Sequence, residues 1–240
     1  MDTKHSTNVT VDLAAPSLYA EPYSKLYRLK RRLTYRDILK HVGSALYGNT
    51  NVTVLEVGTG SGFLMQILEE KYPKANLHGI EFDPRLVQLT RSKVKRAVIV
   101  EGNAETFKME RQFDVIVSSQ VIEHLFHPQE MLKCVFAHLK PGGKFVMTTP
   151  NLGGLGARMM GKRWHGYRAD HVALKTYKQW VAFIESHGFE TVYSGSTFFS
   201  GIPILNRFPL GPINWMLLLA FGSIRWKYGE SFVGVFQKKT

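Results

Sequence analysis

Cysteine is almost absent from this chain of 240 residues, which contains only Cys134. A disulfide framework is therefore excluded, and a reducing compartment is the simpler interpretation. The single thiol stands in an apolar helical pattern, so we expect a small buried hydrophobe rather than a nucleophile. The first twenty residues hold no continuous apolar stretch, so no secretory signal is predicted and a cytoplasmic location is expected.

Long hydrophobic runs are also lacking. The longest extends from Ile213 to Ile224 and is interrupted by Asn214, Gly222 and Ser223. Crossing a bilayer takes about 20 consecutive apolar residues, so no membrane-spanning helix is expected. Hydrophobic residues still make up 44% of the chain, enough for one domain with a sizeable core.

Acidic residues are scarce, with 19 Asp and Glu against 31 Lys and Arg and a net charge of +12. This balance favours an anionic partner, either nucleic acid or an acidic membrane surface. A basic surface that meets only solvent explains the charge equally well. The basic residues fall in three separate clusters, at 25–36, 91–96 and 158–168, and form no single stripe.

From residue 50 onward, strand and helix patterns alternate with short links, and no internal repeat is present. The expected strands cover residues 51–57, 75–82, 96–102, 113–119, 144–150, 190–195 and 231–239, and the expected helices cover 63–72, 84–94, 128–140 and 175–187. Such alternation predicts an α/β fold with a doubly wound, mostly parallel, seven-stranded sheet and helices on both faces.

Two kinds of segment lie outside this alternation. Residues 1–48 are expected to form an N-terminal lead-in with two helices, the second from Tyr35 to about Tyr47. The main domain is expected over 49–240, with insertions at 151–172 and 197–230. A long segment without regular structure inside a compact domain usually has a function or a helix of its own.

The stretch VLEVGTGSG, residues 54–62, places three glycines at every second position behind an apolar run that contains Glu56. Glycine in such a place lets the backbone turn sharply or lets a ligand approach closely. A strand, a glycine-rich turn and a helix form the usual nucleotide cradle. The dinucleotide fingerprint would need glycine where the chain has Phe63, and the Gly-Lys-Ser/Thr of a phosphate loop is missing.

The spacing Glu56-x-Gly58-x-Gly60-x-Gly62 resembles the first motif of class I S-adenosylmethionine (SAM)-dependent methyltransferases. The resemblance covers about residues 50–150. It implies a Rossmann-like methyltransferase fold with an antiparallel C-terminal strand, and SAM as the cofactor. The residues that it implies for SAM binding are Glu56, Gly58, Thr59, Gly60, Gly62, Glu81, Phe82, Asn103, Ala104, Ser119 and Gln120.

The resemblance also implies which part of SAM each of these residues would contact. Glu81 would accept hydrogen bonds from the ribose hydroxyls, as an acidic residue does in nucleotide folds generally. Phe82 would pack on the adenine, and in the adenine-edge segment EGNAETF (101–107) Asn103, Ala104 or Glu105 would lie near its exocyclic amine. Ser119 and Gln120 would face the methionine part, and Glu56 would favour the cationic sulfur.

IEHLFHP (122–128) and TTPN (148–151) are similar to the ubiquinone-biosynthesis O-methyltransferases. In that group a Glu-x-x-Glu-His arrangement binds a divalent metal, whereas this chain has Gln120-x-x-Glu123-His124. The missing carboxylate removes a ligand that a hard cation such as magnesium would need, so no metal is predicted. A hydroxyl acceptor must lose a proton, and Glu123 and His124 are the predicted catalytic residues, with His127 nearby. A histidine satisfied by backbone at a helix start is the alternative for His124.

The acceptor is expected to be set by the insertions. Arginines and aromatics in 151–172 would grip a phosphate, a carboxylate or a base, or else form a mobile lid. Four alternatives are open for the apolar segment 208–229: it would lie in a membrane interface, line an apolar pocket, form a homodimer contact or pack as ordinary core. We expect methylation at oxygen of a small, lipophilic or membrane-associated acceptor. The alternatives are an RNA methyltransferase and a silent SAM-binding scaffold at a membrane.

Overall fold

This computed structural model describes residues 32, 35–46, 51–197, 210–213, 216 and 222–239. The first expected helix, apart from residue 32, and most of the expected insertion at 197–230 lie outside the described residues. The division of the chain at residue 48 stays a prediction.

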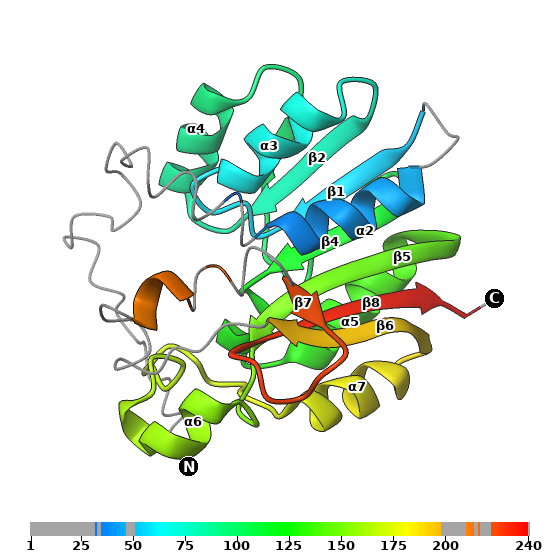
Figure 1. Cartoon of the computed structure of the whole chain (residues 1–240). Coiled ribbons are helices and arrows are strands. Elements are labelled where there is room, and N and C mark those ends of the chain that lie inside the picture. The colour runs from blue at the N-terminus through cyan, green and yellow to red at the C-terminus, as the bar shows by residue number, and fades with distance from the viewer. Residues whose placement is uncertain are drawn as a thin grey trace, which may run out of the picture.

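A single mixed sheet organises the described chain (Figure 1). Its strands are β1 (Thr53–Val57), β2 (Asn76–Glu81), β3 (Val98–Glu101), β4 (Phe113–Ser119), β5 (Leu139–Pro150), β6 (Phe189–Thr197), β7 (Ser223–Ile224) and β8 (Ser231–Lys238). They are arranged in the order β3-β2-β1-β4-β5-β8-β6-β7. The first five strands are parallel to one another, and β8 is antiparallel to both β5 and β6.

The predicted fold class and the antiparallel C-terminal strand are therefore confirmed. The sheet has eight strands rather than seven, because β7 pairs with the end of β6 through two residues. So short a strand has no sequence pattern of its own, since alternation needs about four residues to be recognised.

Helices cover both faces of the sheet. They are α2 (Arg36–Leu46), α3 (Phe63–Lys71), α4 (Pro84–Lys93), α5 (Pro128–His138) and α7 (Tyr177–Glu185). The short helix α6 (Leu155–Met160) packs instead beside the 3₁₀ turn η2 (Gly161–Arg163), and a second 3₁₀ turn, η1 (Ile122–His124), follows β4. Side-chain caps stabilise the first turns of two of these helices. Asp83 accepts from the Arg85 backbone N–H ahead of Pro84 at α4, and Thr176 and Gln179 cap α7 reciprocally.

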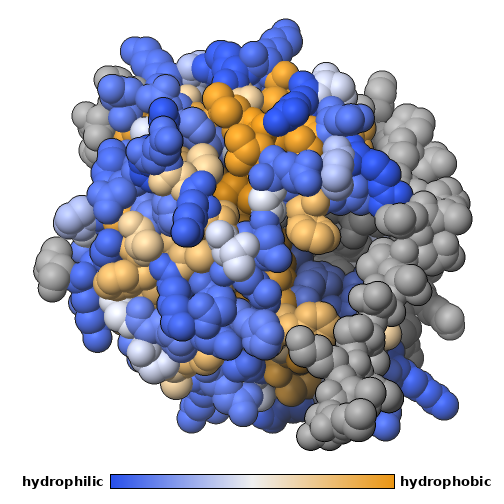
Figure 2. Space-filling view, turned by 180° about the vertical axis from the view of Figure 1, so that it is seen from behind, coloured by the Kyte–Doolittle hydropathy of each residue, from blue (hydrophilic) through white to orange (hydrophobic). Residues whose placement is uncertain are grey.

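Two apolar clusters join the layers. Successive side chains of β1 point to opposite faces, so Val54 packs with α2 and α3 while Leu55 packs with α5 and α7. Trp180 of α7 is fully buried in the second of these clusters. Seen from behind, the surface is mostly hydrophilic, with an apolar area near the top (Figure 2). The two apolar clusters therefore pack the helices against both faces of the sheet.

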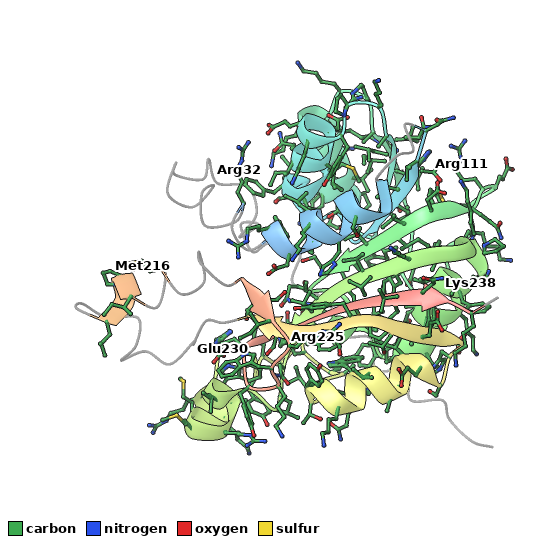
Figure 3. The ribbon with its side chains drawn as sticks, turned by 45° about the vertical axis from the view of Figure 1, so that its right-hand side comes forward. Arg32, Arg111, Met216, Arg225, Glu230 and Lys238 are labelled. Atoms are coloured by element: carbon green, nitrogen blue, oxygen red, sulfur yellow. The ribbon has the colours of Figure 1, made fainter. Side chains whose placement is uncertain are left out.

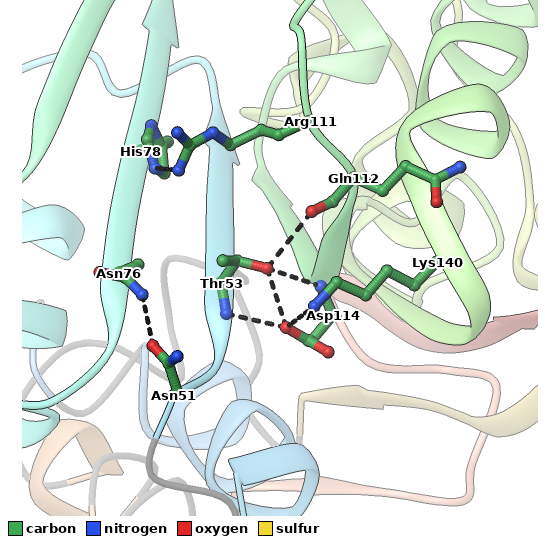
Figure 4. Close-up of polar contacts among 8 residues, drawn as sticks. All are labelled: Asn51, Thr53, Asn76, His78, Arg111, Gln112, Asp114 and Lys140. Carbon is green, nitrogen blue, oxygen red and sulfur yellow. Dashed lines mark hydrogen bonds and ion pairs between the residues drawn. The ribbon is translucent and has the colours of Figure 1, made fainter.

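The amino edge of the parallel strands is held by polar contacts (Figure 4). Thr53 donates to Asp114 Oδ2 from its backbone N–H and its hydroxyl, both at 2.8 Å, and Lys140 Nζ contacts the same oxygen at 2.8 Å. Burial alone would raise the pKa of Asp114, but these hydrogen bonds hold it below its usual value. Arg111 lies 3.0 Å from the His78 ring at the same edge. These groups stabilise the strand ends that lie away from the glycine turn.

Candidate active site

The glycine-rich turn after β1 adopts a backbone that only glycine adopts easily. Gly58, Gly60 and Gly62 have φ angles of 79°, 53° and 75°. The turn is tied to β2, because the N–H groups of Gly58 and Thr59 donate to the Ile80 carbonyl at 2.8 and 3.1 Å. Three glycines at alternate positions are thus required by the shape of the turn.

Glu81 at the end of β2 fastens the same turn. One carboxylate oxygen accepts from the Gly60 N–H at 2.7 Å. The other accepts from the N–H groups of Phe82 and Asp83 at 2.9 and 3.1 Å. Backbone N–H groups after β1 and after β2 thus hold this carboxylate in place. It can accept further hydrogen bonds from a ligand without reorganising.

A cavity of about 900 Å³ opens at the carboxyl ends of the parallel strands, where ligands of open α/β sheets bind. Of the residues predicted to bind SAM, the cavity is lined by Glu56, Gly58, Thr59, Gly60, Glu81, Phe82, Asn103, Ala104, Ser119 and Gln120. Gly62 does not line it; this residue precedes α3, and a side chain there would press on Thr90. Both predicted catalytic residues, Glu123 and His124, line the same cavity.

Glu123 is a buried carboxyl in η1. Its side chain has no exposed surface, and Oε2 accepts from the Thr149 hydroxyl at 3.0 Å. Turning the Gln120 amide over lets its nitrogen donate to Oε1 at 3.3 Å. Burial raises the pKa of Glu123 to about 7, and the nearby Asp170 charge adds to the rise.

His124 is oriented by the segment after η2. Its Nδ1 lies 3.0 Å from the Asp170 backbone oxygen and 3.4 Å from the Asp170 carboxylate. A carbonyl oxygen only accepts, so Nδ1 carries the proton and Nε2 keeps the lone pair. Burial and the charge of His171 lower the pKa of His124, with Asp170 opposing the shift. The imidazole is therefore neutral at pH 7 and able to take a proton at Nε2.

Asp170 and His171 reach the site from the 151–172 insertion, and sequence reasoning did not place them there. His171 meets the His124 ring edge-on, with centroids 4.7 Å apart. Ligand atoms of Glu123, His124 and His171 lie within 4.8 Å of one another, close enough to hold a metal ion. One carboxylate with two imidazoles is a poor donor set for magnesium.

Replacing Gly58 by alanine is expected to disturb the turn more than replacing Gly60. A Cβ at Gly58 would clash with Val121 Cγ2, whereas a Cβ at Gly60 meets nothing within 4 Å. Both variants carry the backbone strain of a positive φ, about 1–2 kcal/mol. Thermal unfolding should therefore rank wild type above Gly60→Ala and Gly60→Ala above Gly58→Ala; equal midpoints for the two variants would contradict this packing.

Residues 27–194 match a protein family described as a methyltransferase domain. This match covers well over half of the chain. The chain belongs to the methyltransferase domain family. The predicted class I SAM-dependent methyltransferase, with SAM as its cofactor, is thereby confirmed.

Curated relatives agree with this family, and a solved structure agrees with the fold. The chain is 28% identical over 124 residues to a malonyl-[acyl-carrier protein] O-methyltransferase of Priestia megaterium, covering 48% of this chain and 45% of the relative. It is 32% identical over 124 residues to the mitochondrial ubiquinone biosynthesis O-methyltransferase of Mus musculus, covering 46% and 31%. The chain thus spans less than half the length of these two relatives. A SAM-dependent methyltransferase structure from Thermotoga maritima has a TM-score of 0.64 at 18% identity and covers 89% of this chain and 94% of its own, which shows the fold.

Proposed function

We propose that this chain transfers the methyl group of SAM to an oxygen of a small, lipophilic or membrane-associated acceptor. The observation that carries the proposal is one cavity that joins the glycine turn and Glu81 to the Glu123–His124 pair. Glu81 holds the ribose, Phe82 and the Asn103–Ala104 segment border the adenine, and Ser119 and Gln120 face the methionine part.

The methyl transfer is an in-line displacement. The acceptor hydroxyl gives its proton to His124 Nε2, its oxygen bonds to the methyl carbon, and the bond between that carbon and sulfur breaks. The products are the methyl ether and S-adenosylhomocysteine (SAH), and the proton stays on His124 Nε2 until it passes to solvent. His124 fits the base role because its Nδ1 proton is engaged by Asp170. Glu123, with a pKa of about 7, is the second candidate for the proton.

The apolar character of the cavity mouth supports a lipophilic acceptor. Phe126 lines the cavity with an exposed fraction of 74% and is not among the residues assigned to SAM. Two of the relatives are named as O-methyltransferases, for a malonyl-[acyl-carrier protein] and in ubiquinone biosynthesis. Among the described residues, no helix has the length and hydrophobicity to cross a bilayer. We propose a cytoplasmic protein that meets the membrane at its surface.

The proposal is tested by measuring SAH formation with a panel of acceptors. The panel contains a short-chain polyprenyl phenol, a malonyl thioester and a single-stranded RNA, each with SAM in excess. We expect SAH with the phenol and none with RNA, whereas SAH with the thioester alone would support methylation at oxygen but contradict a lipophilic acceptor. Methylation of RNA alone would contradict the lipophilic acceptor and favour an RNA methyltransferase. SAM binding without turnover on any acceptor of the panel or on a lipid extract would favour a silent scaffold.

Replacing Glu81 by alanine is expected to weaken SAM binding by about 1–3 kcal/mol, since hydrogen bonds to a charged group are lost. Glu101 is the matched control, because it stands opposite Glu81 in the register of β2 and β3 and does not line the cavity. Calorimetric titration should show weaker binding for Glu81→Ala and unchanged binding for Glu101→Ala. Equal affinity in the two variants would place the ribose elsewhere.

A further inference from the structure

The segment formed by α6 and η2 is held firmly against the end of β8. The buried Glu230 carboxylate accepts from the Gly156 N–H at 3.1 Å and from the Trp164 indole N–H. Trp164 is 1% exposed, and a side chain at Gly156 would clash with Glu230. These contacts argue against the mobile lid considered from the sequence, because the described segment is anchored by buried groups.

The outer side of this segment combines apolar and cationic side chains. Leu155, Met159 and Tyr167 are 38%, 70% and 44% exposed. The cations Arg158, Lys162, Arg163 and Arg168 are exposed among them. No acidic residue occurs from 151 to 169, and Asp170, which follows, contacts Arg168 at 3.0 Å. We call the exposed side of residues 155–168 the α6–η2 face.

The basic character continues onto the connection between β7 and β8. The guanidinium of Arg158 and the ammonium of Lys227 each lie 5.1 Å from the Tyr228 ring. Arg225 and Lys227 are exposed on the same connection. Figure 3 shows Arg225 and Glu230 on the side of the molecule that carries α6.

The α6–η2 face also borders the cavity. His165 and Arg168 line it, as do Asp170 and His171 just beyond. A surface in contact with the α6–η2 face would therefore lie next to the acceptor entrance. This adjacency distinguishes the α6–η2 face from the basic cluster at 91–96, none of whose residues lines the cavity.

We infer that the α6–η2 face docks on an anionic lipid bilayer and presents the cavity to acceptors in that bilayer. The inference rests on the proposed function for its acceptor. Exposed Leu155 and Met159 enter the boundary between headgroups and acyl chains, while the surrounding cations contact lipid phosphates. RNA would use the cations but would leave these two aliphatic side chains without a role, so the bilayer is favoured.

The test is sedimentation with vesicles of phosphatidylcholine alone or with about 30% phosphatidylglycerol, whose anionic headgroups attract basic segments. The variants are Lys162→Glu with Arg163→Glu, and separately Met159→Gln. The control is Lys74→Glu with Lys95→Glu, which makes the same charge change at exposed positions before β2 and β3. Thermal unfolding checks that every variant is folded.

We expect wild type and control to sediment with anionic vesicles, and to do so less as salt rises. The double variant of the α6–η2 face should bind at least about tenfold more weakly, and Met159→Gln should bind more weakly at unchanged charge. Equal binding by all proteins, or binding of a single-stranded RNA but of no vesicle, would overturn the inference. The vesicles contain no acceptor and no SAM, so this result is independent of methyl transfer, which the acceptor panel tests without vesicles.

Discussion

Turnover of His124→Ala is expected to fall by roughly 10²- to 10⁴-fold, the usual effect of removing a positioned general base. The affinity for SAM should stay unchanged, because the described contacts of His124 are with Asp170 and His171 rather than with the glycine turn. The measurement is the initial rate of SAH formation with the phenol, whose hydroxyl must lose a proton, together with a SAM titration.

His127→Ala is the matched control, since His127 is an exposed histidine three residues further on that does not line the cavity. Its rate should equal that of wild type. Dialysis against EDTA before the assay adds a second control. Loss of turnover on chelation, restored by a divalent ion, would mean that the Glu123–His124–His171 cluster works as a metal site and that the base assignment is wrong.

Glu123→Gln is expected to stabilise the protein in alkaline solution and to leave it nearly unchanged in acid. Burial raises the pKa of Glu123 from 4.5 to about 7 in the folded chain. The folded state therefore binds this proton more tightly than the unfolded state. Protonation of Glu123 therefore adds to the free energy of unfolding. This stabilisation is fully present below pH 4.5 and is lost as the pH rises through 7.

The size of this pH effect is about 3 kcal/mol above pH 8, from the shift in pKa. Glutamine keeps an oxygen that accepts from Thr149 but never ionises, so the variant avoids the cost of a buried charge. Urea unfolding at pH 5 and pH 8.5 checks this, with Glu101→Gln as an exposed control. A stability difference that is the same at both pH values would contradict the buried, strongly shifted carboxyl.

The residues on the glycine-turn side of the cavity could be located from the sequence because they act locally. Gly58, Gly60 and Gly62 form one turn, and Glu81 ends the next strand, so spacing and strand ends locate them. The fold class followed from the alternation of strands and helices for the same reason. The roles of these residues toward SAM stay predictions.

The acceptor side could not be predicted to the same depth. Asp170 reaches His124 across 46 residues, and Glu230 anchors Gly156 across 74. Neither pair belongs to a periodic pattern, and both depend on how the insertion packs against the end of the sheet. The sequence therefore predicted only a loop or small insertion at 151–172. In the structure, part of this segment forms the helix α6, which is held by buried contacts. Tertiary packing decided the local structure there.

Calorimetric titration of the purified chain with SAM and with SAH tests the central claim most directly. The account predicts saturable binding of both ligands at one site per chain, weakened by Glu81→Ala and unaffected by His124→Ala. Absence of binding by a chain that unfolds cooperatively would contradict the account, since the glycine turn and Glu81 would then hold some other ligand.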